Sequence, residues 1–139
     1  FTERARITPD GNTVYRDKDS GHIGGGFYSR TKTCAVGTTN FMKFDLTHGA
    51  LAGSVYATAS NNARSISKTY SYALAYADGA NVEDLADSGS FGGTDFDVSV
   101  STSASAHTFR VTVTGSHSIE VNLTVVVGCA NQDITYTEL

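Results

Sequence analysis

The chain has 139 residues and a formal net charge of −4 at pH 7, which leaves room for one domain and a short appendage. Its ten Lys and Arg residues are scattered, which argues against a nucleic-acid partner, since a phosphate backbone is bound by clustered basic side chains. Hydrophobic residues make up 40% of the chain, yet no apolar run approaches the roughly 20 residues that span a bilayer, so we expect no membrane insertion.

The first element that the sequence predicts is a short hairpin. Two short strands, around Ala5–Thr8 and Thr13–Tyr15, flank a turn over Pro9–Asn12, where each residue type favours tight turns. Strands of this length cannot form a core alone. Because the sequence begins at Phe1 rather than Met, we also expect the chain to be a piece of a longer protein.

This N-terminal segment resembles a known family. The run Thr2-Glu3-Arg4-Ala5-Arg6-Ile7-Thr8-Pro9-Asp10-Gly11-Asn12 is similar to a segment of phage tail fibres and related trimeric virion proteins, where it belongs to an intertwined β-stem before a C-terminal head. The family pattern usually continues into a Val-Gly-Ile-Gly-like stretch, which this chain lacks. The resemblance implies a homotrimer that is folded in the host cytoplasm, resides in the virion and contacts the remaining fibre or virion proteins.

A charged and then glycine-rich stretch, Asp17–Gly26, is predicted to form the neck between stem and head, because glycine permits unusual backbone angles and close approach. It lacks the Lys-Ser/Thr ending and the following helix of a phosphate-binding loop, which argues against a nucleotide site. The sequence therefore predicts two parts: a stem and neck over 1–26 and a head over 27–139.

Within the head, apolar and polar side chains alternate with a period of two from Thr31 onward, the pattern of strands with one buried face. No segment keeps the 3.6-residue apolar period of a helix. Seven or eight such strands predict an all-β fold, an antiparallel β-sandwich with a jelly roll as the leading topology. The runs contain the residues Met42, Phe44, Leu46, Val55, Ala57, Ala59, Tyr70, Tyr72, Leu74, Tyr76, Phe96, Val98, Val100, Phe109, Val111, Val113, Ile119, Val121, Leu123, Val125 and Val127.

The stretch Asp78–Thr94 interrupts the alternation and is predicted to be the single long connecting loop of the head. Alternate turns of an antiparallel sandwich emerge at the same end, so the turn at His48, this loop and the turn at His117 are expected to share one end. The turns at Asn61–Arg64 and Ser103–Ala106 are expected at the other end.

Acidic residues cluster within and after this loop, at Glu83, Asp84 and Asp87 and then at Asp95 and Asp97. Paired carboxylates hydrolyse glycosidic bonds when held ~5–9 Å apart, and carboxylate oxygens also bind Ca²⁺. Neither group has the residue order of a calcium loop. We interpret both as solvated surface charge and expect no metal site there.

The histidines and serines give no catalytic pattern. The four histidines, including His107 and His117, lie at or beside predicted turns without the spacing of metal ligands. No serine has the Gly-x-Ser-x-Gly frame of a nucleophile. We therefore predict no catalytic residues, no cofactor and no enzymatic activity.

The two cysteines, Cys34 and Cys129, lie almost at opposite ends of the regular region. They pair only if the first and last strands of the head bring them together. Two separate buried thiols are the favoured alternative, because Cys packs as a small hydrophobic residue.

Tyrosines are abundant, and they fall into two groups: those on the same strand face as the apolar residues and those on the other face. Tyr70, Tyr72 and Tyr76 share a face with Leu74, which predicts core or trimer-interface positions. Tyr28 and Tyr56 fall off this phase and are expected to be exposed. Exposed Tyr offers a flat apolar ring with a polar edge, the chemistry of sugar recognition, although it is equally ordinary in trimer packing.

Loops on a rigid β-scaffold are where binding residues concentrate. The predicted receptor-binding surface is therefore the end that carries the long loop. Its candidate residues are His48, Asp78, Asn81, Glu83, Asp84, Asp87 and His117.

The function predicted from these features is a phage tail-fibre tip that binds a glycan or protein on the host-cell surface as a homotrimer. Three weak sites on one trimer add up by avidity, which suits a sequence without catalytic constellations. One alternative is a structural virion protein for capsid decoration or the baseplate. Another is a tailspike that degrades polysaccharide, which requires acidic side chains in a groove.

Overall fold

The structure is a computed structural model that describes residues 5–16, 23–47, 50–60, 64–75, 79–89, 93–103, 105–129 and 134–139. Most of the described residues belong to strands, and none of the described segments is a helix that could cross a membrane. The strands are β1 (Ala5–Ile7), β2 (Thr13–Arg16), β3 (Ile23–Cys34), β4 (Gly37–Leu46), β5 (Ala50–Ser60), β6 (Ser65–Ala75), β7 (Gly79–Gly89), β8 (Asp95–Ser103), β9 (Ala106–Thr114), β10 (Ile119–Cys129) and β11 (Ile134–Glu138).

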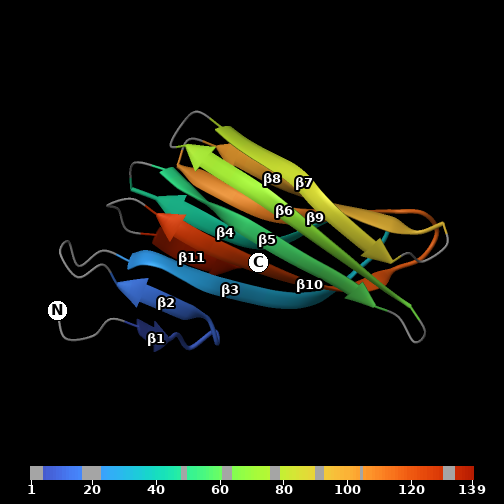
Figure 1. The fold of residues 1–139 in the computed structure, drawn as a ribbon, viewed down its shortest axis with the longest axis horizontal. Helices are drawn as coiled ribbons and strands as arrows, with labels where there is room; N and C mark the ends of the chain where they lie inside the picture. Colours follow the sequence, from blue (N-terminus) through green and yellow to red (C-terminus); the bar gives the residue numbers. More distant parts are fainter. Residues whose placement is uncertain are drawn as a thin grey trace.

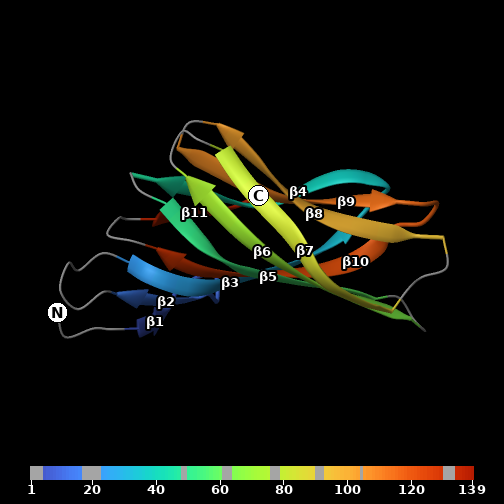
Figure 2. The ribbon, with the colours of Figure 1, turned by 45° about the horizontal axis from the view of Figure 1, so that its top comes forward.

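The strands form two antiparallel sheets that pack face to face, so the predicted all-β sandwich is confirmed (Figures 1 and 2). The larger sheet has seven strands in the order β1-β2-β3-β10-β5-β6-β7, and the smaller has four in the order β11-β4-β9-β8. Strand β10 inserts between β3 and β5 while β4 lies beside β9, which is the interleaving of a jelly roll. The meander β5-β6-β7 within one sheet departs from a simple jelly roll.

The N-terminal hairpin extends the larger sheet. β1 pairs with β2, and β2 pairs with β3 through Thr13↔Phe27 and Val14↔Gly26. The predicted boundary between 26 and 27 falls inside β3, so the glycine-rich stretch from Ile23 is strand. The trimeric stem and the division into two parts stay predictions.

The core lies between the sheets and follows the predicted alternation. On β10 the inward side chains are buried and the intervening Glu120, Asn122 and Thr124 face away. Tyr70 and Tyr72 are buried as expected. The core residues of β10 are Ile119, Val121, Leu123, Val125 and Val127.

The prediction for the off-phase tyrosines was half wrong. Tyr56 is 49% exposed, as expected, but Tyr28 is 2% exposed. On β3 the glycines and polar residues obscure which face is inward, and Tyr28 turns toward the core, where its ring packs against Phe44 at 5.0 Å. The pairing with β10, which places Tyr28 opposite Val125, decides its side.

The prediction of a long loop over Asp78–Thr94 was also wrong, because most of this stretch is the edge strand β7. β7 pairs with β6 over its whole length, with a β-bulge where Thr69 faces Ala86 and Tyr70 faces Asp84. The bulge shifts the side-chain alternation by one residue and so hides the period of two from the sequence. Acidic side chains on an edge strand also oppose pairing with another chain.

This additional strand changes which turns lie together. β7 carries the chain from one end of the sandwich to the other, so His117 lies at the opposite end from the start of β5 and the end of β4, which flank the His48 turn. Ser103 and Ala106 pair at the end near Asp45, away from the end where Ser60 and Ser65 pair. Both predicted groupings of turns were therefore wrong.

The two cysteines lie far apart in the β3–β10 ladder. Cys34 is buried, free and opposite Ile119, whereas Cys129 is ten residues further along β10, on the order of 33 Å away. A disulfide requires Cα atoms within about 7 Å, so this fold does not bring the two cysteines together, and Cys34 is a buried free thiol as the favoured alternative predicts. The side chain of Cys129 lies outside the described part of the structure. Burial raises the pKa of Cys34.

His107, expected at a turn, is instead a fully buried core residue of β9. It lies opposite Phe44 and Thr102 on the neighbouring strands, and neither ring nitrogen has a hydrogen-bond partner. Desolvation by burial lowers its pKa, while the negative charge of Asp45 acts in the opposite direction. The folded protein therefore holds this imidazole in its neutral form.

A buried neutral histidine makes stability depend on pH. The pKa of His107 in the folded state lies below the unfolded value of about 6.5, and above that pH the free energy of unfolding keeps its full value. As the pH drops toward the lowered pKa, the unfolded chain binds a proton that the folded chain does not, so the free energy of unfolding falls. We expect His107→Phe to reduce this loss and to raise the free energy of unfolding at pH 7 by about 1 kcal/mol, because two unpaired polar atoms leave the core.

Chemical denaturation between pH 5 and 8 measures both effects. His117→Gln is the matched control, because it removes a histidine that is exposed rather than buried. Equal slopes for the His107 variant and the unmodified chain would contradict the assignment.

Candidate functional site

The predicted binding residues do not gather at one end of the sandwich. Asn81, Glu83, Asp84 and Asp87 lie along β7, and His117 lies in the turn before β10. His48 and Asp78 lie outside the described residues. The site predicted from the sequence therefore remains a prediction, and the structure places four of its five described residues on the edge strand β7.

One of these β7 residues, Asp87, and Asp95 of β8 lie beside a buried lysine at the seam between β7 and β8. Asp87 lies opposite Lys68 of β6 in the ladder, and the Lys68 Nζ lies 3.9 Å from the Asp87 carboxylate and 3.0 Å from Asp95 of β8. The same ammonium lies over the ring of Phe96, 5.2 Å from its centre. Asp84, two ladder positions further along, faces Tyr70.

A tyrosine completes the seam. The buried Tyr70 donates its hydroxyl hydrogen to Asp97 Oδ1 at 2.9 Å, and the Val98 amide lies 3.3 Å from the same hydroxyl oxygen. Burial, and then the hydrogen bond and charge of Asp97, raise the pKa of Tyr70 well above its usual value. The phenol therefore stays protonated and links the two sheets.

One carboxylate from each of the two acidic groups of the sequence, Asp87 and Asp95, thus lies beside the same cation. The pKa of Asp84 is raised by desolvation and then by the hydrogen bond and charge of Asp87, while Lys68 acts in the opposite direction. Within the described ranges, no group of three or more Asp, Glu, His or Cys side chains is arranged to hold a metal ion. Lys68 lies between Asp87 of the larger sheet and Asp95 of the smaller sheet, so we interpret the seam as a set of ion pairs that joins the edges of the two sheets.

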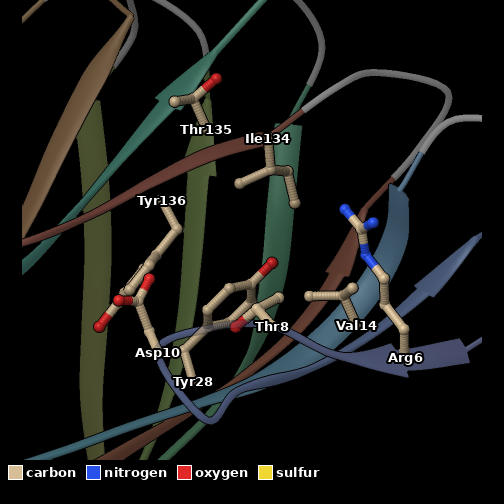
Figure 3. A pocket seen from close by; sticks show the side chains of 8 residues that line it. All are labelled: Arg6, Thr8, Asp10, Val14, Tyr28, Ile134, Thr135 and Tyr136. Carbon is tan, nitrogen blue, oxygen red and sulfur yellow. The ribbon is translucent and has the colours of Figure 1, made fainter.

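A different feature, which sequence reasoning missed, is a pocket at the opposite open side. The N-terminal hairpin, β3 and β11 enclose a hollow of about 230 Å³ (Figure 3). Arg6 lies at one side of it, and Asp10 and Tyr136 lie at the other. Its lining side chains are Arg6, Thr8, Asp10, Val14, Tyr28, Ile134, Thr135 and Tyr136.

Two aromatic rings form the floor of this pocket. The rings of Tyr28 and Tyr136 lie 4.9 Å apart between centres at 31° to each other, and both pack against Phe44. Phe44 is fully buried and contacts Phe109 in turn. This packing holds the two tyrosines rigidly, with part of Tyr136 open to the pocket.

The polar side of the pocket is held by the β1–β2 turn. The amide of Thr8 donates to the Asn12 carbonyl at 2.7 Å, and Gly11, with φ of +83°, donates to the Thr8 carbonyl at 2.9 Å. Asn12 is buried, and its Oδ1 accepts a hydrogen bond from the Ser29 amide at 2.9 Å. The turn that carries Asp10 is thereby fixed onto β3.

Polar atoms without partners lie beside the pocket. The Asn12 Nδ2 and the Tyr136 hydroxyl are buried, yet neither has a hydrogen-bond partner. Burial raises the pKa of Tyr136, whereas the nearby Asn12 side chain acts in the opposite direction without completing a hydrogen bond. Buried polar groups are rarely left unpaired, so these two atoms mark a polar spot in the packing behind the pocket, and Asn12 itself does not line it.

The chemistry of this pocket suits a small polar ligand with an apolar face. Aromatic rings offer a surface for the apolar face, while the Asp10 carboxylate accepts hydrogen bonds and Arg6 and the Thr8 hydroxyl donate them. The sequence signal for the pocket was the turn Pro9–Asn12 followed by aromatic residues. The sequence alone predicts a stem for this segment, because Tyr136, which completes the pocket, is more than a hundred residues away along the chain.

Comparison with known proteins finds no relative of the chain: no family model, no curated protein and no solved structure matches it. The resemblance of the N-terminal segment to tail fibres therefore stays a prediction.

The seam around Lys68 generates a stability prediction. Lys68→Ala leaves Asp87 and Asp95 without their cation and Phe96 without its cover, so we expect the free energy of unfolding to fall by about 1–3 kcal/mol. Urea denaturation at pH 7 measures the loss. Lys68→Met, which keeps the apolar stem, is expected to recover part of it.

Lys43→Ala is the matched control, because Lys43 makes an exposed ion pair with Asp45 at 3.6 Å on the outer side of the smaller sheet. Its removal is expected to cost less than about 0.5 kcal/mol. Equal losses for the two alanine variants would show that the seam contributes no more than a surface pair.

Proposed function

We propose that this chain is the tip of a phage tail fibre that attaches to a host cell by binding a surface saccharide in the pocket between the N-terminal hairpin and β11. The observation that carries the proposal is the pairing of a rigid tyrosine floor with a charged and polar rim. No catalytic role is assigned to the chain.

The chemical match to a saccharide rests on three contacts. The ring of Tyr136 offers a flat apolar surface for the C–H face of a sugar, and the Asp10 carboxylate accepts hydrogen bonds from its hydroxyls. Arg6 supplies donors from the other side of the pocket (Figure 3). A volume of about 230 Å³ lies below the ~300–1,000 Å³ of drug-sized sites, which suits one sugar unit of a longer chain.

The oligomeric part of the proposal rests on the tail-fibre resemblance. A single shallow pocket binds a sugar weakly, whereas three pockets on one homotrimer bind a surface with many copies of that sugar much more firmly. Location in the virion and contacts with other fibre proteins belong to the same proposal.

A glycan array with the purified chain, followed by binding of the labelled chain to host cells, tests the function. We expect Asp10→Asn to weaken binding of the selected saccharide about tenfold, because the charge-assisted hydrogen bonds of the carboxylate are lost while the shape of the pocket is kept. We expect Tyr136→Leu to weaken it a few-fold or more, because the flat ring that faces the sugar is removed. Titration calorimetry with that saccharide measures both changes.

Glu83→Gln is the matched control: it changes an exposed carboxylate of the β7 site predicted from sequence. Weakened binding by Glu83→Gln and Asp84→Asn, with the pocket variants unaffected, would move the site to β7. Binding to cells without binding to any glycan would indicate a protein receptor. Failure to bind either would favour the structural virion protein.

A further inference from the structure

The outward side of the larger sheet carries a broad surface without charged side chains, here called the neutral face. It spans β1, β2, β3, β10 and β5, where cross-strand pairs such as Phe27↔Val126 and Thr124↔Tyr56 place its members side by side. Glu120 follows it one row beyond Asn122. The neutral face consists of Ile7, Tyr15, Phe27, Ser29, Thr31, Ser54, Tyr56, Thr58, Asn122, Thr124 and Val126.

Large apolar side chains are concentrated on this face. Ile7 is 73% exposed, and Tyr15, Phe27 and Tyr56 are each exposed by more than two fifths. Tyr15 and Phe27 pack edge to face with ring centres 6.0 Å apart, so they form one aromatic patch. Exposed patches of this kind mark interaction surfaces, and aromatic side chains without charge are typical of interface centres.

The polar side chains of the neutral face hydrogen-bond to one another. Asn122 Nδ2 donates to Thr31 Oγ1 at 2.9 Å and to Ser29 Oγ at 3.2 Å. The Thr124 hydroxyl donates to Asn122 Oδ1 at 3.1 Å, and the Ser29 and Thr124 hydroxyls lie 3.1 Å apart. Because these groups already have partners, burying them leaves few unpaired polar atoms.

The outer side of the smaller sheet has the opposite character. It carries the ion pair of Lys43 and Asp45, and Arg110 donates to Ser99 at 3.0 Å. Asp95 and Asp97 of β8 are exposed beside this surface. Copies of a chain with a net charge of −4 repel one another where such charges meet, and the neutral face is free of that penalty.

We infer that the neutral face is the surface by which copies of this chain pack together. The number of copies, three, rests on the proposed function. The new inference is that the neutral face is the part of the fold that faces the threefold axis. Each copy would contribute Phe27 and Tyr56 to a shared apolar centre at the axis, where equivalent residues of the three copies come together, while neighbouring copies contact each other through two different parts of this surface.

A second copy fits this face better than a saccharide does. Sugar recognition needs free donors and acceptors that point to the ligand, whereas the Ser29, Asn122 and Thr124 groups are occupied by one another. The pocket lined by Arg6 and Tyr136 opens between the sheets, on the opposite side of β1–β2–β3 from the neutral face. Packing through the neutral face therefore leaves each pocket accessible.

Sedimentation equilibrium of the full chain tests the inference. We expect the unmodified chain to be trimeric at micromolar concentration. Phe27→Lys and Tyr56→Lys each place a charge in the shared centre, so we expect each to weaken association at least tenfold and the double variant to be monomeric. Far-ultraviolet circular dichroism and thermal melting verify that the variants are folded.

Leu85→Lys and Val36→Lys are the matched controls, because both residues are large, apolar and more than half exposed but lie outside the neutral face. We expect both variants to remain trimeric. A monomeric unmodified chain, unchanged association of the Phe27 and Tyr56 variants, or equal dissociation of the controls would overturn the inference.

Saccharide binding separates this inference from the proposed function. We expect the monomeric double variant to keep the single-site affinity measured by calorimetry and to lose firm attachment to cells. A trimer that dissociates as expected but binds no saccharide leaves the interface standing and removes the proposed function. Loss of single-site affinity in the folded double variant would make the neutral face a ligand surface and overturn the inference.

Discussion

Strand β10 is hydrogen-bonded to β3 on one side and to β5 on the other, and its inward side chains Val121, Leu123 and Val125 are fully buried. This central ladder joins the first strands of the sandwich to the meander that follows them. The position of Tyr28 in the pocket floor and the neighbours of Tyr56 on the neutral face both depend on its register. A slip of one residue would exchange the two faces of the strand and remove the core.

The seven-stranded sheet is wider than the four-stranded sheet, so its outermost strands extend beyond the smaller layer. The spaces between the sheets at the two sides of the sandwich are filled in different ways. Between β7 and β8, the buried Lys68 and Tyr70 hold carboxylates of both sheets. At the other side, the hairpin β1–β2 extends past β11, where Tyr136 only partly fills the space. The pocket is thus a consequence of unequal sheets, and its polar rim comes from the turn that carries Asp10.

The outer faces of the two sheets differ in charge: the neutral face of the larger sheet, which we infer to be an interface, has no charged side chains, whereas the outer side of the smaller sheet has several. The neutral face groups exposed rings with hydroxyl and amide side chains that already bond to one another, so it is inexpensive to desolvate. The outer side of the smaller sheet keeps the ion pair of Lys43 and Asp45 in water. A chain organised in this way can pack with copies of itself through one face, present a ligand pocket between its layers and leave its charged face to solvent.

The amino-acid sequence by itself determined the all-β class, the sandwich and the core, because alternation such as that from Ile119 to Val127 records directly which side chains are buried. It did not reveal β7, whose bulge near Asp84 breaks the alternation, and the ends of the sandwich were therefore assigned wrongly. Tertiary structure alone decided that Tyr28 turns inward and that Lys68 lies between Asp87 and Asp95. It also decided that Tyr136 lines one pocket with the N-terminal turn. Each of these depends on strands that are distant in sequence, and no local pattern encodes their pairing.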